Sequence, residues 1–128
     1  MTSSIFNFGA PVANREDSLF VVVPAELATR ASLLEVLGRH LRFPSYYGKN
    51  WDALEECIND LSWLNERIVV IQHTRLPRRI PEHHLQTYLA ILGDAVVSWR
   101  TRPEHDLIVC FASEDQEAVA NLTANPDS

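Results

Sequence analysis

Residues 18–23 read Ser-Leu-Phe-Val-Val-Val, a continuous apolar run that ends at Pro24. A short apolar run without polar alternation is typical of a strand that is buried on both faces of a sheet. Two further runs have the same character, at residues 67–72 (Arg-Ile-Val-Val-Ile-Gln) and 106–112 (Asp-Leu-Ile-Val-Cys-Phe-Ala). We therefore expect three buried strands.

The segments between these runs predict helices. Apolar residues recur at spacings of three and four over residues 25–41, 51–61 and 82–99, and Asn50 is a suitable N-cap for the second segment. Strands that alternate with helices favour a parallel sheet. The predicted fold class is therefore α/β, a three-layer fold in which a three-stranded parallel sheet is flanked by helices that cover both of its faces.

The chain of 128 residues is expected to form one domain over residues 18–112. Residues 1–17 carry several turn formers, and they predict a loose N-terminal arm. Residues 113–128 are polar and predict a frayed C-terminal tail.

The charge balance bears on the class of partner. There are 17 acidic residues against 11 basic residues, a formal net charge of -6. Nucleic-acid binding needs clustered lysine and arginine, so this balance argues against nucleic acid as a direct partner and suits a cationic one. Arg75, Arg78 and Arg79 form a local basic cluster, for which a solvated loop is favoured over a nucleic-acid patch.

Cysteine usage and apolar runs bear on the compartment. Cys57 and Cys110 form no zinc-binding pattern and no disulfide framework, and free thiols are typical of a reducing compartment. Residues 1–11 lack the features of a signal peptide, and no apolar stretch is long enough to span a membrane. We expect a cytoplasmic protein without membrane contact.

The segment 43–64 carries the functional signal. One side of its predicted helix holds the apolar residues Trp51, Leu54, Ile58 and Leu61. The other side holds four acidic residues: Asp52, Glu55, Glu56 and Asp60. No lysine or arginine is interleaved with these acids, and a loop with two tyrosines precedes them. A solvated helix face is one interpretation, and a binding face for a cationic partner is the other.

Within this segment the chain resembles the barstar family of ribonuclease inhibitors. The resemblance lies in the stretch Phe43-Pro44-x-Tyr46-Tyr47-Gly48-x-Asn50-x-Asp52-Ala53-Leu54-x-x-Cys57. The resemblance implies a barstar-like fold. It also implies an intracellular inhibitor or immunity protein, as in a toxin–antitoxin pair, which blocks the basic active site of a ribonuclease with an acidic helix and a tyrosine loop. It implies no cofactor and no metal, and a monomer before the complex forms.

The resemblance also implies site residues. The partner-binding set would comprise Tyr46, Tyr47, Gly48, Asn50, Asp52, Glu55, Glu56 and Asp60. Tyr46 corresponds to a family tyrosine that lies against the catalytic histidine of the nuclease, and Asp52 corresponds to a contact aspartate. Glu56 replaces the dominant aspartate of the family, and Glu55 replaces a tryptophan of the type member. These departures suggest a different cognate nuclease. Asp94 is a weak candidate for a further acidic contact on the helix 82–99.

The sequence also admits other interpretations. A barstar-like module that binds another cationic protein or toxin remains an alternative to the nuclease inhibitor. A hydrolase that uses Asp52 and Glu56 is disfavoured, because a convex helix is a poor place for a catalytic pocket, and we expect no enzyme. The segment Glu82-His83-His84 lacks the spacing of metal ligands.

Five residues in and near the acidic helix have structural expectations of their own. Cys57 lies on the apolar side, which favours a buried structural thiol over a nucleophile. Trp51 is expected in the core, and Tyr47 is expected to pack while Tyr46 points elsewhere. Gly48 is expected to supply a positive φ in the loop.

Overall fold

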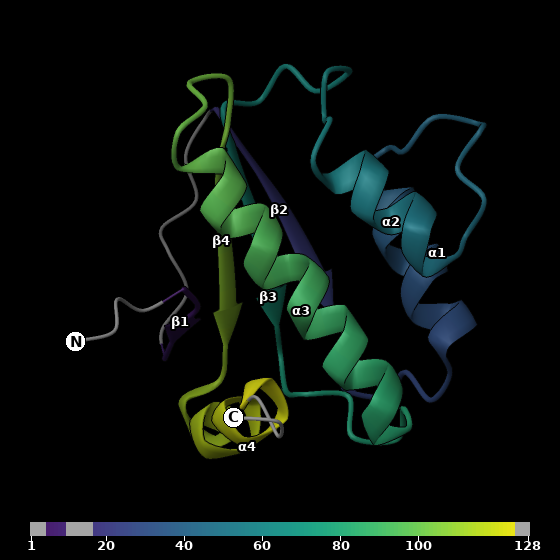
Figure 1. The fold of residues 1–128 in the computed structure, drawn as a ribbon, viewed down its shortest axis with the longest axis vertical. Helices are drawn as coiled ribbons and strands as arrows, with labels where there is room; N and C mark the ends of the chain where they lie inside the picture. The colour runs from purple at the N-terminus through teal and green to yellow at the C-terminus, as the bar shows by residue number, and fades with distance from the viewer. Residues whose placement is uncertain (1–4, 10–16, 125–128) are drawn as a thin grey trace.

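The structure is a computed structural model that describes residues 5–9 and 17–124 (Figure 1). In this part of the chain, four parallel strands form one sheet in the order β1-β4-β3-β2. The strands are β1 (Asn7–Phe8), β2 (Ser18–Val23), β3 (Ile68–His73) and β4 (Asp106–Phe111). The remaining residues of the predicted N-terminal arm, 1–4 and 10–16, lie outside the described residues.

The α/β class with a parallel sheet is confirmed, with four strands in place of three. The three long strands come from the three apolar runs, and they pair in register, with Val21 opposite Ile71 and Ile71 opposite Val109. Their alternate side chains form the sheet's contribution to the core: Val21, Val23, Val69, Ile71, Leu107, Val109 and Phe111. The expected cover of both faces is incomplete, because Val22 between two buried valines is 47% exposed.

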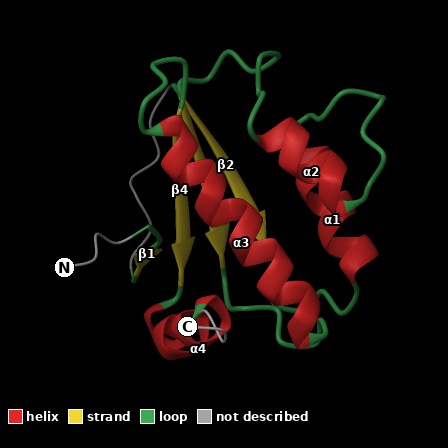
Figure 2. Ribbon diagram, viewed as in Figure 1, coloured by secondary structure: helices red, strands yellow, loops and turns green. Residues whose placement is uncertain are grey.

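The helices pack against this sheet through the predicted apolar stripes. Helix α1 spans Arg30–His40, α2 spans Trp51–Ile58, and α3 spans Glu82–Trp99, the residues predicted for it. Helix α1 begins later than predicted, because Thr29 caps it in a capping box with Ser32. Figure 2 shows α3 crossing in front of the strands, with α1 and α2 together beside β2.

Strand β1 corrects the prediction of a loose N-terminal arm. Its two residues pair with Cys110 and Phe111 at the end of β4. The adjacent Phe6 is buried, and its ring centroid lies 5.2 Å from that of Phe111, while Phe8 stacks on the same ring at 6.0 Å. Aromatic packing on one β4 side chain therefore attaches this short strand to the sheet.

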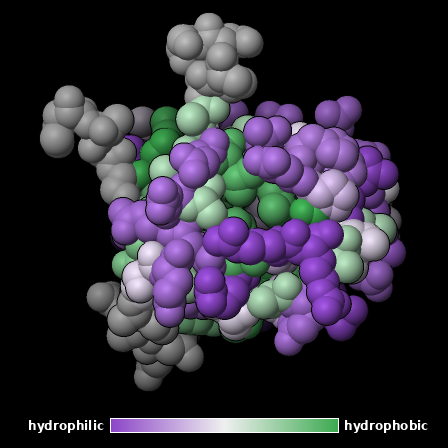
Figure 3. Space-filling model, turned by 90° about the horizontal axis from the view of Figure 1, so that it is seen from below, coloured by the Kyte–Doolittle hydropathy of each residue, from purple (hydrophilic) through white to green (hydrophobic). Residues whose placement is uncertain are grey.

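The predicted frayed tail is also wrong over residues 113–123, which form the short 3-10 helix η1 (Ser113–Asp115) and helix α4 (Gln116–Thr123). Val119 and Leu122 of α4 are buried against the core. Seen from the end of the molecule that carries α4, hydrophilic residues cover most of the surface and hydrophobic ones lie between them (Figure 3). The remaining residues of the predicted tail, 125–128, lie outside the described residues.

Asp115 anchors this C-terminal part. Its carboxylate is fully buried, and it accepts two hydrogen bonds from Arg75 at 2.9 and 3.0 Å and one from Arg78 at 3.2 Å. The backbone N–H of Leu76 donates a further bond at 2.8 Å. The hydrogen bond from Arg75 is the main reason that the pKa of Asp115 falls to about 2, against the opposing effect of burial.

His73, at the end of β3, is a neutral polar group in the core. It is fully buried, its Nδ1 lies 2.9 Å from the carbonyl oxygen of Cys110, and its Nε2 lies 2.7 Å from the hydroxyl of Tyr88. A carbonyl oxygen only accepts, so Nδ1 donates and Nε2 accepts the hydroxyl proton. Burial lowers the pKa of His73 to about 4, which agrees with this neutral tautomer.

Candidate functional site

Helix α2 separates acidic from apolar side chains, as its spacing predicts. Leu54, Cys57 and Ile58 are buried, and the burial of Cys57 fits the predicted structural thiol. The acidic residues of the other side are Asp52, Glu55 and Glu56, which are exposed, and Asp60, which is partly exposed just beyond the helix. The salt bridges formed within the described residues use none of these four acids. We call these four residues the acidic face.

The start of α2 is fixed by its N-cap, as predicted. The Oδ1 of Asn50 accepts a hydrogen bond from the backbone N–H of Ala53 at 2.8 Å. The positive φ expected at Gly48 is wrong, because the adjacent Lys49 adopts it instead, with φ 57°. A Cβ on Gly48 would lie 3.2 Å from the Nδ2 of Asn50, so the glycine leaves room for the capping side chain. Gly48 and Asn50 therefore shape the site from within the chain.

The two tyrosines point in different directions, as predicted. Tyr46 is 64% exposed. Its pKa is raised, first by desolvation and then by Cys57, Asp60 and Glu56, which indicates that its hydroxyl lies near the acidic face. The structure therefore brings Tyr46 together with the acids of α2.

Tyr47 instead packs inward. Its hydroxyl donates a hydrogen bond to the carbonyl of Leu34 at 3.0 Å, and its ring lies 4.7 Å from that of Phe43. A Cβ on Gly38 would lie 2.7 Å from the Tyr47 ring, so this close approach requires the glycine. Tyr47 attaches the loop to α1, and these contacts leave its side chain partly buried.

The two tryptophans near the site are partly buried. Trp51, expected in the core, packs against it only in part, and its ring centroid lies 6.1 Å from that of His84. Trp63 donates from its indole N–H to the carbonyl of Leu41 at 3.0 Å. Trp63 therefore ties the segment after α2 to the end of α1.

The basic cluster that the sequence singled out has an internal role. Arg75 and Arg78 bind Asp115, so the interpretation as a plain solvated loop is incomplete. Asp115 was not predicted as a functional residue, because the polar segment 113–128 was expected to be a frayed tail. The spacing of Val119 and Leu122 after an acidic residue was the available signal for a short helix there.

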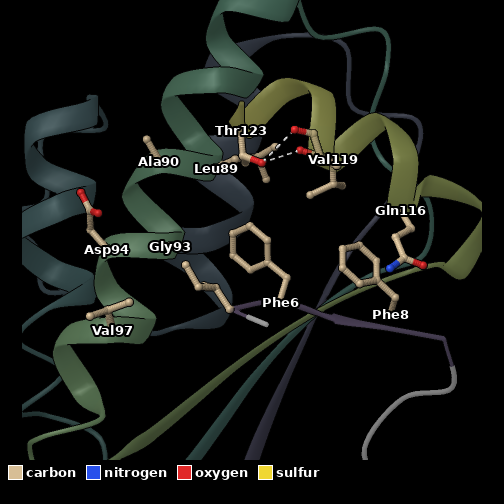
Figure 4. Close-up of a pocket in the computed structure, with 12 residues that line it drawn as sticks. Phe6, Phe8, Leu89, Ala90, Gly93, Asp94, Val97, Gln116, Val119 and Thr123 are labelled. Atoms are coloured by element: carbon tan, nitrogen blue, oxygen red, sulfur yellow. Dashed lines mark hydrogen bonds between the residues drawn. The ribbon is translucent and has the colours of Figure 1, made fainter. Parts of the chain in front are cut away.

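A pocket of 560 Å³ lies away from the acidic face, between β1, α3 and α4 (Figure 4). Phe6 and Phe8 point into it, and Val119 of α4 faces them. Asp94, the candidate for an acidic contact on α3, is among the residues that line this pocket, and its carboxylate points away from the two phenylalanine rings (Figure 4). The lining is mostly apolar and lacks the converging polar groups of a catalytic site.

The described residues, 5–9 and 17–124, also bear on metal binding and membrane insertion. No group of three or more histidine, cysteine, aspartate or glutamate side chains there could hold a metal ion. No helix of the described chain has the length and apolarity needed to cross a bilayer.

Comparison with known proteins identifies the family. Residues 18–112 match the family model described as Barstar (barnase inhibitor). The match includes the acidic face, Tyr46 and all three long strands. No curated protein sequence matches the chain significantly. Because the family model covers most of its length, the chain belongs to the barstar family.

Proposed function

We propose that this protein inhibits a ribonuclease by inserting the acidic face and Tyr46 into the basic active site of the enzyme. Membership of a family described as barnase inhibitors supports a ribonuclease as the protein partner. The observation that carries the mechanism is the state of the acids. Asp52, Glu55 and Glu56 are exposed on one side of α2, and Asp60 follows just beyond its end. No salt bridge within the described residues uses any of these four acids.

The mechanism follows from the chemistry of RNA binding. A ribonuclease gathers arginine, lysine and histidine around an RNA phosphate. A carboxylate can take the place of that phosphate, because it accepts two parallel hydrogen bonds from one arginine. Glu56 lies one helical turn after Asp52 on the same side of α2, so the two carboxylates can address adjacent cationic groups together.

Tyr46 supplies the apolar part of the contact. Its ring is exposed beside the acids, where an aromatic face can pack against an imidazole or a guanidinium group. A ring with few rotatable bonds loses little conformational entropy on binding. We propose that Tyr46 covers the catalytic base of the nuclease while Asp52 and Glu56 bind its arginines.

The net charge of -6 supports rapid capture of a basic enzyme. Opposite charges raise the rate of association, and the effect weakens as ionic strength rises. A toxic enzyme must be captured before it acts, so a fast association is useful to the cell. We propose that the protein acts in the cytoplasm, as expected for a chain with two free and buried cysteines.

The test is inhibition of purified barnase, measured as cleavage of an RNA substrate over a titration of the inhibitor. We expect stoichiometric inhibition by the natural chain. Neutralising Glu56 (Glu56→Gln) removes charged hydrogen bonds, so the inhibition constant should rise by about tenfold or more. Glu35→Gln on α1 is the matched control, since it removes the same charge from another exposed helix position and should change the constant less than threefold.

The outcomes separate the candidate functions. Loss of inhibition in Asp52→Asn and Glu56→Gln, together with survival of barnase-expressing cells that make the natural chain, would support the proposal. Binding of barnase without loss of RNA cleavage would overturn it in favour of a binding module for cationic proteins. Inhibition that survives neutralisation of both acids would contradict the acidic-face mechanism.

A further inference from the structure

The C-terminal end of α2 lies against the end of α3 and the connection that follows it. The last carbonyl groups of a helix have no partners within the helix. Here the indole N–H of Trp99 donates to the carbonyl of Ile58 at 2.9 Å, and a guanidinium N–H of Arg102 donates to the carbonyl of Asn59 at 2.7 Å. Two side chains of α3 and its connection thus complete the end of the acidic helix.

Arg102 is held in place by more than this bond. Its guanidinium carbon lies 3.6 Å from the centre of the Trp99 ring, which is a cation–π geometry. The side chain is only partly exposed, and the indole beneath it is buried. A fixed cation at this place also interacts favourably with the negative end of the α2 dipole.

His105 holds the turn that follows α2. It is 5% exposed, its Nδ1 lies 2.8 Å from the carbonyl oxygen of Glu66, and its Nε2 lies 3.0 Å from that of Leu61. Both oxygens only accept, so a ring nitrogen is the donor in each of these contacts. Leu61 has a positive φ of 51°, a backbone state that a side chain other than glycine rarely adopts unless its surroundings enforce it.

Helix α2 needs this support. It has only eight residues, and isolated helices of that length are unstable in water. Its like-charged residues Asp52 and Glu56 stand four positions apart, which weakens it further. The N-cap Asn50 fixes one end, and Trp99, Arg102 and His105 fix the other.

We propose that Trp99, Arg102 and His105 form a clamp that positions the acidic face and sets how long a bound partner stays. They are positioning residues, since the clamp acts through α2. The inference rests on the proposed function for its effect on binding, but the effect on α2 itself is independent of any partner. An acidic helix that frays must be ordered again on binding, and that ordering costs affinity.

The test compares Arg102→Met with Arg67→Met. Methionine keeps an apolar chain against Trp99 but removes the charge and the donor. Arg67 is the matched control, because it forms an exposed ion pair with Asp106 and the same net charge is lost. The first measurement is amide hydrogen exchange in the free protein, and the second is the dissociation rate of the barnase complex.

For Arg102→Met we expect exchange in residues 54–61 and the dissociation rate each to rise about tenfold, with exchange in β3 unchanged. The control variant should change both rates less than threefold. Arg102→Lys keeps the charge, so its exchange and dissociation rates should rise less than those of Arg102→Met. A general loss of stability would raise exchange throughout the sheet, which would contradict a positioning role. Unchanged exchange in α2 would overturn the clamp. If the natural chain does not bind barnase, inhibition of this enzyme fails, and the exchange measurement alone decides on the clamp.

Discussion

Asp115 and Glu56 carry the same charge in opposite surroundings. Asp115 is fully buried and receives bonds from two arginines and a backbone N–H. Glu56 is exposed on α2, and it takes part in no salt bridge within the described residues. One carboxylate is satisfied by the fold, and the other is left for the solvent or a partner.

This contrast shows how the chain distributes its negative charge. A buried carboxylate stabilises the fold only if nearby groups replace the water it loses. An exposed carboxylate contributes little to stability, and it keeps its full capacity to accept hydrogen bonds from another molecule. The acids of α2 therefore suit binding, whereas Asp115 suits a structural role.

Removal of the two carboxylates should give very different losses of stability. Asp115→Ala leaves Arg75 and Arg78 without their common partner and the N–H of Leu76 buried without an acceptor. Both arginine side chains are about half exposed and can be hydrated, so we expect a loss of about 3 kcal/mol in the free energy of unfolding. Urea denaturation measures it. Glu56→Ala is the control, expected within about 0.5 kcal/mol of the natural chain. Equal losses for the two variants would contradict the comparison.

The contrast between buried and exposed ionisable groups also predicts a pH dependence. His73 has a pKa of about 4 in the folded protein against an ordinary value of 6.5. As pH falls from 6.5 to 4, His73 takes up a proton in the unfolded chain but stays neutral in the folded chain. The free energy of unfolding therefore decreases by about 3 kcal/mol in that window. Below pH 4 both states bind the proton, so His73 causes no further decrease.

The measurement is the free energy of unfolding by urea between pH 7 and pH 4. His73→Gln cannot take up the proton, so its curve should be flatter than that of the natural chain. Parallel curves for the two proteins would show that His73 does not titrate as its surroundings indicate.

The sequence predicted most of the fold because long apolar patterns determine it. The limits of β2 and α3 agree with their predicted ranges, since each pattern is long and ends at a proline or at a polar segment. Strand β1 has two residues, too few for any periodicity, and it depends on Phe111 from the far end of the chain. Helix α4 depends in the same way on Arg75 and Arg78, which bind Asp115 across about 40 residues of sequence.

The candidate site likewise has a part that the sequence predicted and a part that it did not. Helical spacing alone placed the acids of α2 on the exposed side, and the identity of Asn50 indicated the start of the helix. The clamp was not predictable, because nothing in the sequence around His105 shows that α3 ends beside α2. Contacts that join distant segments need the tertiary structure, whereas exposure on one helix needs only its period.

The smallest expected effect bears on the acidic face directly. Glu56→Gln removes the like-charge pair with Asp52 and a negative charge from the C-terminal half of α2, so it should stabilise the protein by about 0.5 kcal/mol. Glu35→Gln is the control with the opposite sign, because Glu35 stands four residues before Arg39 and loses a weak ion pair at 3.8 Å. Urea denaturation at low salt measures both changes, and about 1 M salt should remove most of each.

A stabilising Glu56→Gln that also weakens inhibition would show that the acid is retained for binding at the expense of the fold. A destabilising Glu56→Gln would mean that α2 uses this carboxylate for its own structure, and the comparison with Asp115 would fail.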